Sequence, residues 1–129
     1  MIKTHSVILR LLIIILAAVL LLSIVACSTS PSPDADITIN LSASENIFDK
    51  TSITVPAGAI VAIVFDNKDS VLHNFALYET SAATNSFFVG ELISRKTITY
   101  IFMTPTTPGT YFFRCDLHPI IMTGNFIVN

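Results

Sequence analysis

The chain has 129 residues, which is the length of one small domain. Its formal net charge is −2, and only 12 % of its residues are charged. A nucleic-acid-binding domain presents a basic face, so this composition argues against nucleic acid as a partner.

The N-terminal segment is far more apolar than the rest of the chain. Lys3 and Arg10 precede an apolar run at residues 11–26, which ends at Cys27. A membrane-spanning helix needs about 20 apolar residues, and this run of 16 is shorter. The basic flank and the small residues at its end favour a signal peptide at residues 1–26 over a transmembrane anchor, the alternative.

The sequence IVAC, residues 24–27, resembles the lipobox of bacterial lipoproteins. The resemblance implies cleavage before Cys27 and a lipid on its sulfur. The mature protein would then be membrane-anchored outside the cytoplasm, in the periplasm or on the outer face of the cell membrane. Cys115, the other cysteine, would be a lone thiol. A Cys27–Cys115 disulfide is the alternative, but Cys27 begins a tail and does not lie in a folded element.

Residues 27–36 are rich in Ser and Pro and predict a flexible tether. We therefore expect the folded domain at residues 37–129, close to the length of a small β-sandwich. Residues 27–129 hold five Lys and Arg against nine carboxylates, so the net charge of the mature chain is 5 − 9 = −4 with His neutral.

The expected domain has the pattern of a series of short strands. Residues 37–42 alternate between apolar and polar, and residues 59–65 are almost wholly apolar and rich in β-branched side chains, as in a central strand. Further strands are expected at residues 52–55, 73–78, 96–102, 111–115 and 124–129. Residues 79–95 lack a clean period and predict a loop with a short helix or strand. This order predicts a β-sandwich or a barrel.

Cys115, His118 and Met122 lie close together near the end of the chain, and the expected mature chain has one other histidine, His73. Each residue alone is most simply a core or surface residue. Together, a thiolate, two imidazoles and a weak thioether suit a type 1 copper site. Zinc more often takes four strong ligands, and magnesium and calcium prefer oxygen. Because strand ends distant in sequence meet at one end of a sandwich, His73 is expected to lie beside this loop.

Four sequence features together resemble the cupredoxins, specifically the plastocyanin- and amicyanin-like blue copper proteins. They are His-Asn at residues 73–74, GTYF at 109–112, C-x2-H-x3-M at 115–122 and GNFIV at 124–128. The resemblance covers residues 37–129.

This resemblance implies an all-β, Greek-key β-sandwich that binds one copper ion. His73, Cys115 and His118 would be the equatorial ligands, and Met122 the axial ligand. The chain would carry single electrons, as Cu(I) and Cu(II), to redox partner proteins that belong to membrane or periplasmic electron transport. It is expected to be a monomer and not an enzyme. The alternatives are a copper-binding or copper-delivery lipoprotein and a metal-free interaction module.

The sequence also predicts which residues surround the expected site. Phe75, Phe113 and Phe126 are candidates for a dry shell around the sulfur. Asp116, next to Cys115, is expected to be a solvated loop residue.

The resemblance further implies that electrons leave through the edge of His118. Its apolar neighbours either form a surface patch that marks a docking site or pack beneath the loop. These neighbours are Leu117, Pro119, Ile120 and Ile121.

Overall fold

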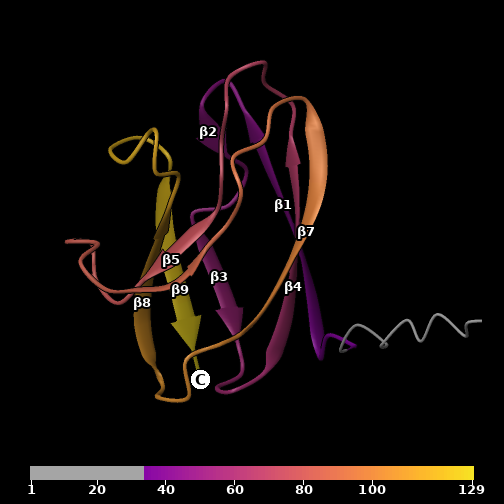
Figure 1. Cartoon of the computed structure of the whole chain (residues 1–129). Helices are drawn as coiled ribbons and strands as arrows, with labels where there is room; N and C mark the ends of the chain where they lie inside the picture. Colours follow the sequence, from indigo (N-terminus) through magenta and orange to yellow (C-terminus); the bar gives the residue numbers. More distant parts are fainter. Residues whose placement is uncertain (1–33) are drawn as a thin grey trace, which may run out of the picture. The chain divides into compact units, whose positions relative to one another are not determined.

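The structure, a computed structural model, describes residues 34–129, and this part of the chain forms two β-sheets packed face to face (Figure 1). The all-β fold expected from the sequence is confirmed. Within residues 34–129, no helix is long and apolar enough to cross a membrane. The expected signal peptide, Cys27 and most of the tether at 27–36 lie outside the described residues.

The first sheet has the strand order β2-β1-β4-β7. Its strands are β1 (Ile37–Ser44), β2 (Ile47–Phe48), β4 (Ile60–Asn67) and β7 (Lys96–Met103). β4 lies between β1, which runs parallel to it, and β7, which runs antiparallel to it. Val61, Ile63 and Phe65 of β4 are fully buried in the core, whereas Ile60 and Val64 are only half-buried. The apolar run of β4 therefore has one face in the core and one partly exposed face.

The second sheet has the order β3-β9-β8-β5-β6. Its strands are β3 (Ser52–Val55), β5 (Ala76–Tyr78), β6 (Ser86–Val89), β8 (Gly109–Arg114) and β9 (Thr123–Val128). β8 pairs antiparallel with both β9 and β5, so it lies at the centre of this sheet.

Aromatic side chains from both sheets fill the space between them. The ring of Phe113 in β8 lies 5.6 Å from that of Phe48 in β2 and 5.4 Å from that of Phe75, between ring centroids. Phe65, Phe75, Phe113 and Phe126 are all fully buried. Burial of a phenylalanine stabilises a fold by about 1.5–3 kcal/mol, so this cluster is a large part of what joins the two sheets.

Three local expectations were wrong or incomplete. The strand expected at 73–78 begins only at Ala76, because His73 forms a single isolated bridge with Ile93. Residues 79–95 were expected to form a loop with a short helix or strand, and they contain the short strand β6. The two-residue strand β2 was not expected at all, since Ile47–Phe48 is too short to show a period.

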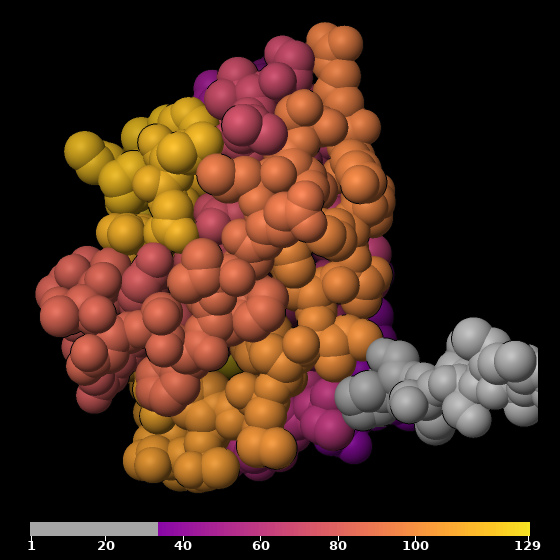
Figure 2. All heavy atoms as spheres, viewed as in Figure 1, coloured from indigo at the N-terminus to yellow at the C-terminus, as the bar shows by residue number. Residues whose placement is uncertain are grey.

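At one end of the sandwich, connections between strands of both sheets lie close together. Asn67, the last residue of β4, pairs with Lys96, the first of β7, and at this same end Arg114 of β8 pairs with Thr123 of β9. In Figure 1 this is the upper end, where the yellow loop between β8 and β9 lies near the β4–β5 connection. The same loop stands out from the surface in the space-filling view (Figure 2). Side chains of the β4–β5 and β8–β9 connections therefore meet at this end.

Gly124 in β9 provides a test of how tightly this end is packed. A methyl group at Gly124 would lie 2.5 Å from Cε1 of Phe113 and 2.7 Å from the Thr51 carbonyl oxygen. Overpacking of this kind costs about 1–3 kcal/mol. We expect Gly124→Ala to lower the free energy of unfolding by that amount, as measured by urea unfolding followed by circular dichroism.

The control is Gly109→Ala in the adjacent strand β8, where the new methyl group would meet only Tyr111, at 3.8 Å. It should leave the free energy of unfolding nearly unchanged. Equal stability of the two variants would contradict this view of the packing.

Candidate metal centre

The backbone of His73 is held by an isolated β-bridge to Ile93, a residue of the β6–β7 connection. Its N–H donates to the Ile93 carbonyl and its carbonyl accepts from the Ile93 N–H, both at 3.0 Å. The side chain is fully buried. This single bridge fixes the position of the imidazole at the end of the sandwich where the β8–β9 loop lies.

The loop from Cys115 to Met122 is closed by its own backbone hydrogen bonds. The Cys115 N–H donates to the Met122 carbonyl at 2.9 Å, and the Met122 N–H donates to the His118 carbonyl at 3.0 Å. The His118 N–H in turn donates to the Cys115 carbonyl at 3.2 Å. The loop is therefore compact, and Cys115, His118 and Met122 all lie on one closed turn.

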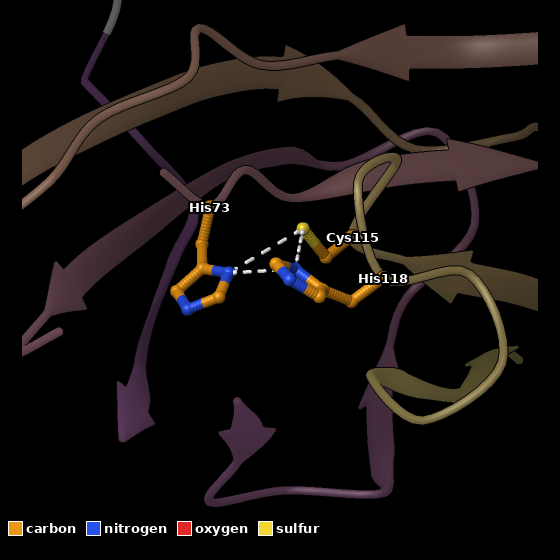
Figure 3. Close-up of side chains that lie close together, drawn as sticks. All are labelled: His73, Cys115 and His118. Atoms are coloured by element: carbon orange, nitrogen blue, oxygen red, sulfur yellow. Dashed lines mark hydrogen bonds between the residues drawn. The ribbon is translucent and has the colours of Figure 1, made fainter. Parts of the chain in front are cut away.

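The side chains of His73, Cys115 and His118 point toward one another, although His73 is far from the other two in the sequence (Figure 3). Their ligand atoms all lie within 4.8 Å of one another. The Cys115 Sγ is 3.7 Å from Nδ1 of His73 and 3.7 Å from Nδ1 of His118, and the two Nδ1 atoms are 3.1 Å apart. The expectation that His73 lies beside the loop is confirmed.

These distances fit a single ion bound by all three side chains. With bonds of about 2.0 Å to nitrogen and 2.3 Å to sulfur, donors at 120° lie roughly 3.5 Å apart for two nitrogens and 3.7 Å for nitrogen and sulfur. The observed triangle is close to this size without rearrangement. One soft thiolate and two imidazoles are the equatorial donor set of type 1 copper.

Met122 is fully buried and belongs to the same apolar cluster as Cys115. Its role as the axial ligand stays a prediction.

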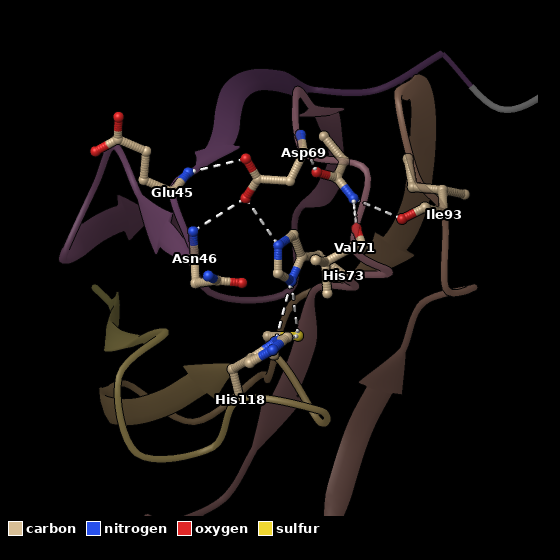
Figure 4. Close-up of polar contacts among 9 residues, drawn as sticks. Glu45, Asn46, Asp69, Val71, His73, Ile93 and His118 are labelled. Carbon is tan, nitrogen blue, oxygen red and sulfur yellow. Dashed lines mark hydrogen bonds and ion pairs between the residues drawn. The ribbon is translucent and has the colours of Figure 1, made fainter.

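The outer nitrogen of His73 forms a hydrogen bond with a carboxylate (Figure 4). This partner was not expected from the sequence. Nε2 of His73 lies 3.0 Å from Oδ2 of Asp69, whose oxygens also accept the backbone N–H groups of Glu45 and Asn46 at 2.9 and 3.0 Å. The hydrogen bond from Asn46, followed by that from Glu45, holds the pKa of Asp69 below its ordinary value. The available signal was an acidic residue four positions before the histidine, in the DNKDS segment.

Asp116 is not the solvated loop residue expected from the sequence. Its carboxylate accepts hydrogen bonds from the Tyr78 hydroxyl at 2.7 Å, the Asn74 amide at 3.1 Å and Nε of Arg114 at 3.0 Å. Its own N–H donates to Oδ1 of Asn74 at 2.9 Å. Burial alone would raise the pKa of Asp116, but the hydrogen bonds from Tyr78, Asn74 and Arg114 outweigh burial and lower it.

The pair of Asn74 and Asp116 connects the two halves of the centre. Asn74 follows His73 directly, and Asp116 follows Cys115 directly. Two hydrogen bonds between them therefore fix the distance between the two ligand-bearing segments, which are 42 residues apart in the chain.

The inner side of the centre is apolar and its outer side faces solvent. Phe75, Phe113 and Phe126, the candidates for a dry shell, are fully buried and share a cluster with Cys115. His118 is only half-buried.

The apolar neighbours of His118 are exposed, so the alternative that they pack beneath the loop is wrong. Ile120 is 90 % exposed and Ile121 60 %. Leu117 and Pro119 are also exposed. We call these four residues, Leu117, Pro119, Ile120 and Ile121, the loop patch.

Comparison with known proteins gives a family match. A family model described as a cupredoxin-like domain matches residues 13–128. A search of curated proteins found no match.

Several solved structures are similar to the chain. Auracyanin A, described as a "blue" copper protein from Chloroflexus aurantiacus, is 29 % identical, with a TM-score of 0.63 over 71 % of this chain and 98 % of its own. Auracyanin from Roseiflexus castenholzii is 23 % identical, with a TM-score of 0.62 over 74 % and 99 %. Amicyanin from Paracoccus versutus is 23 % identical, with a TM-score of 0.53 over 78 % and 86 %. The last two likenesses support the fold.

Proposed function

The chain belongs to the cupredoxin-like family, and on that premise we propose that it is a type 1 copper protein that transfers single electrons. His73, Cys115, His118 and Met122 would hold one copper ion. The observation that carries the proposal is the convergence of one thiol and two imidazoles, with ligand atoms within 4.8 Å of one another.

Copper held in this way supplies one-electron chemistry, as Cu(I) and Cu(II). The chain contributes a fixed arrangement of donors. His73 is held by its bridge to Ile93, and Cys115 by the closed loop and by the Asn74–Asp116 pair. A site that is already assembled needs little rearrangement when its charge changes, which favours fast electron transfer. The buried phenylalanines keep water from the sulfur.

His118 and the loop patch support a route for the electron to leave. His118 is the ligand of the triad that is partly exposed, and exposed apolar residues surround it in the chain. An apolar patch lets a redox partner approach closely without the cost of stripping water from charged groups. We place the docking site of the partner protein on the loop patch.

The burial of the ligands argues against the alternative of a copper-delivery protein. Cys115 and His73 are both fully buried, so a receiving protein cannot reach them without opening the fold. Electrons do not need such access. We therefore propose no delivery role. The expectations of a monomer and of no enzymatic activity come from the cupredoxin resemblance and belong to the same proposal.

The proposal includes a location outside the cytoplasm. The signal peptide expected at residues 1–26 and the IVAC sequence before the Ser/Pro-rich tether support a lipid anchor at Cys27. A tether of this composition would keep the domain at residues 37–129 close to the membrane while letting it turn toward partners.

Copper binding is tested with the fragment from Ser28 onward. One equivalent of Cu(II) should give an intense visible absorption band from thiolate-to-copper charge transfer, with a reversible one-electron wave in voltammetry. Cys115→Ser should abolish the band because it removes the thiolate.

Met103→Leu is the control, since Met103 is exposed at the opposite end of β7 from the centre. It should retain the band in full. A colourless wild-type complex would contradict type 1 copper, and a coloured complex with no reversible wave would favour copper binding without electron transfer.

Docking through the loop patch is tested by Ile120→Asp. We expect the electron self-exchange rate between oxidised and reduced copies to fall at least tenfold, because two facing carboxylates cost at least about 1.4 kcal/mol. The absorption band should be unchanged. Nuclear magnetic resonance line widths of mixed samples measure the rate.

Met103→Asp adds the same charge at the other end of the domain and should leave self-exchange nearly unaffected. Equal rates in the Ile120→Asp variant and the wild type would refute docking through this patch.

The anchor is tested by Cys27→Ser in cells that express the full chain. The variant should carry no lipid in mass spectrometry. It should either leave the membrane fraction for the soluble fraction or keep its signal peptide uncleaved. Cys115→Ser should remain lipidated. Unchanged membrane attachment with no lipid on the wild type would instead support a transmembrane anchor.

A further inference from the structure

We infer that Asp69 is a positioning residue that orients His73 and, on the basis of the proposed copper function, stabilises the oxidised site relative to the reduced one. The inference rests on a chain of hydrogen bonds that leads from the β1–β2 turn to the ligand (Figure 4).

The β1–β2 turn is shaped to hold an anion. Glu45 and Asn46 have φ values of 56° and 59°, the left-handed region that non-glycine residues rarely adopt. Successive backbone N–H groups in such a turn point to the same side, and here both donate to the carboxylate of Asp69. The strained turn is therefore tied to one acidic side chain from another loop.

Asp69 is also fixed from its own backbone. Its N–H donates to Oδ1 of Asn67 at 2.9 Å. The amide of Asn67 in turn donates to the carbonyls of Val71 and Ile93, at 2.8 and 2.6 Å. Since Ile93 is the bridge partner of His73, the carboxylate and the imidazole are positioned by one connected network.

This network determines which nitrogen of His73 faces the centre. Nε2 donates its hydrogen to Oδ2 of Asp69, so Nδ1 of the neutral ring presents its lone pair toward Cys115. A ring rotated about its Cβ–Cγ bond would lose this hydrogen bond and leave a buried N–H without a partner, which costs about 1–3 kcal/mol.

The two imidazoles are not equivalent in this respect. Within the described residues, the polar contacts of the His118 ring are with His73 and Cys115, and none is with a carboxylate. Asp69 therefore acts on one ligand selectively. A carboxylate on the outer nitrogen makes an imidazole a stronger donor, and its negative charge favours the more highly charged metal state. Both effects favour Cu(II) and lower the reduction potential.

The test is Asp69→Asn, which keeps the size of the side chain and removes its charge. The Cu(II) affinity should fall by about 10- to 100-fold, the range found when such partners of metal ligands are changed. Cu(I) affinity should fall less, so the reduction potential should rise. Each tenfold change in the ratio of the two affinities corresponds to about 59 mV.

The matched control is Asp49→Asn. Asp49 also accepts a backbone N–H close to the β1–β2 hairpin, that of Ser42 at 2.7 Å, but does not contact a ligand. It should leave the potential in place even if it lowers stability. The amide of Asp69→Asn could place its NH2 group against the turn N–H groups and prevent folding. In that case Asp69→Ala, which leaves room for water, replaces it, and the reduction potential should again rise. An unchanged potential in the folded Asp69 variants, or an equal shift in Asp49→Asn, would overturn the inference.

A measurement without metal separates this inference from the copper proposal. In the metal-free wild type, ¹⁵N nuclear magnetic resonance should find His73 with its proton on Nε2, protected from exchange, and Asp69→Ala should remove that protection. A proton on Nδ1 would overturn the positioning role whatever the chain does with copper. A His73 ring that behaves as expected, in a protein that does not turn blue, would count against the copper proposal alone.

Discussion

The constraint on which this molecule depends is that three donor side chains from two distant parts of the chain must meet at one buried point. His73 lies in the β4–β5 connection, and Cys115 and His118 follow it by 42 and 45 residues. The Cys115–Met122 loop is closed by its own backbone hydrogen bonds, but these do not place it against His73. The convergence depends on the packed sandwich, which brings both connections to the same end, and on a few specific hydrogen bonds that fix them there.

Two carboxylates beside the centre, those of Asp116 and Asp69, each accept three hydrogen bonds. Asp116 accepts from three side chains and binds the segment after Cys115 to the segment after His73. Asp69 accepts from two backbone groups and from His73. Partly buried charges cost stability unless they are paired, and here the pairing also supplies geometry. The polar groups thus hold the centre from outside, while apolar rings close it from within.

Much of this could be predicted from the sequence, because its signals are local or depend on residue type. The alternation at residues 37–42 and the apolar run at 59–65 mark strands, as period and burial require. The donor set was visible because the stretch of chain from residue 34 onward has two histidines and one cysteine. Asp69 and Asp116 were not recognised, because their roles come from loops that meet only in three dimensions. The strand at 73–78 was placed too early for a similar reason: His73 looks like a strand residue, but only one bridge forms there.

Copper binding by all three side chains is tested most directly by X-ray absorption spectroscopy at the copper edge of the loaded protein. We expect one short bond to sulfur and two to imidazole nitrogen, with the same three ligands after reduction. A first coordination sphere of nitrogen and oxygen alone, without a short sulfur bond, would contradict it, because copper would then lie outside the triangle formed by His73, Cys115 and His118.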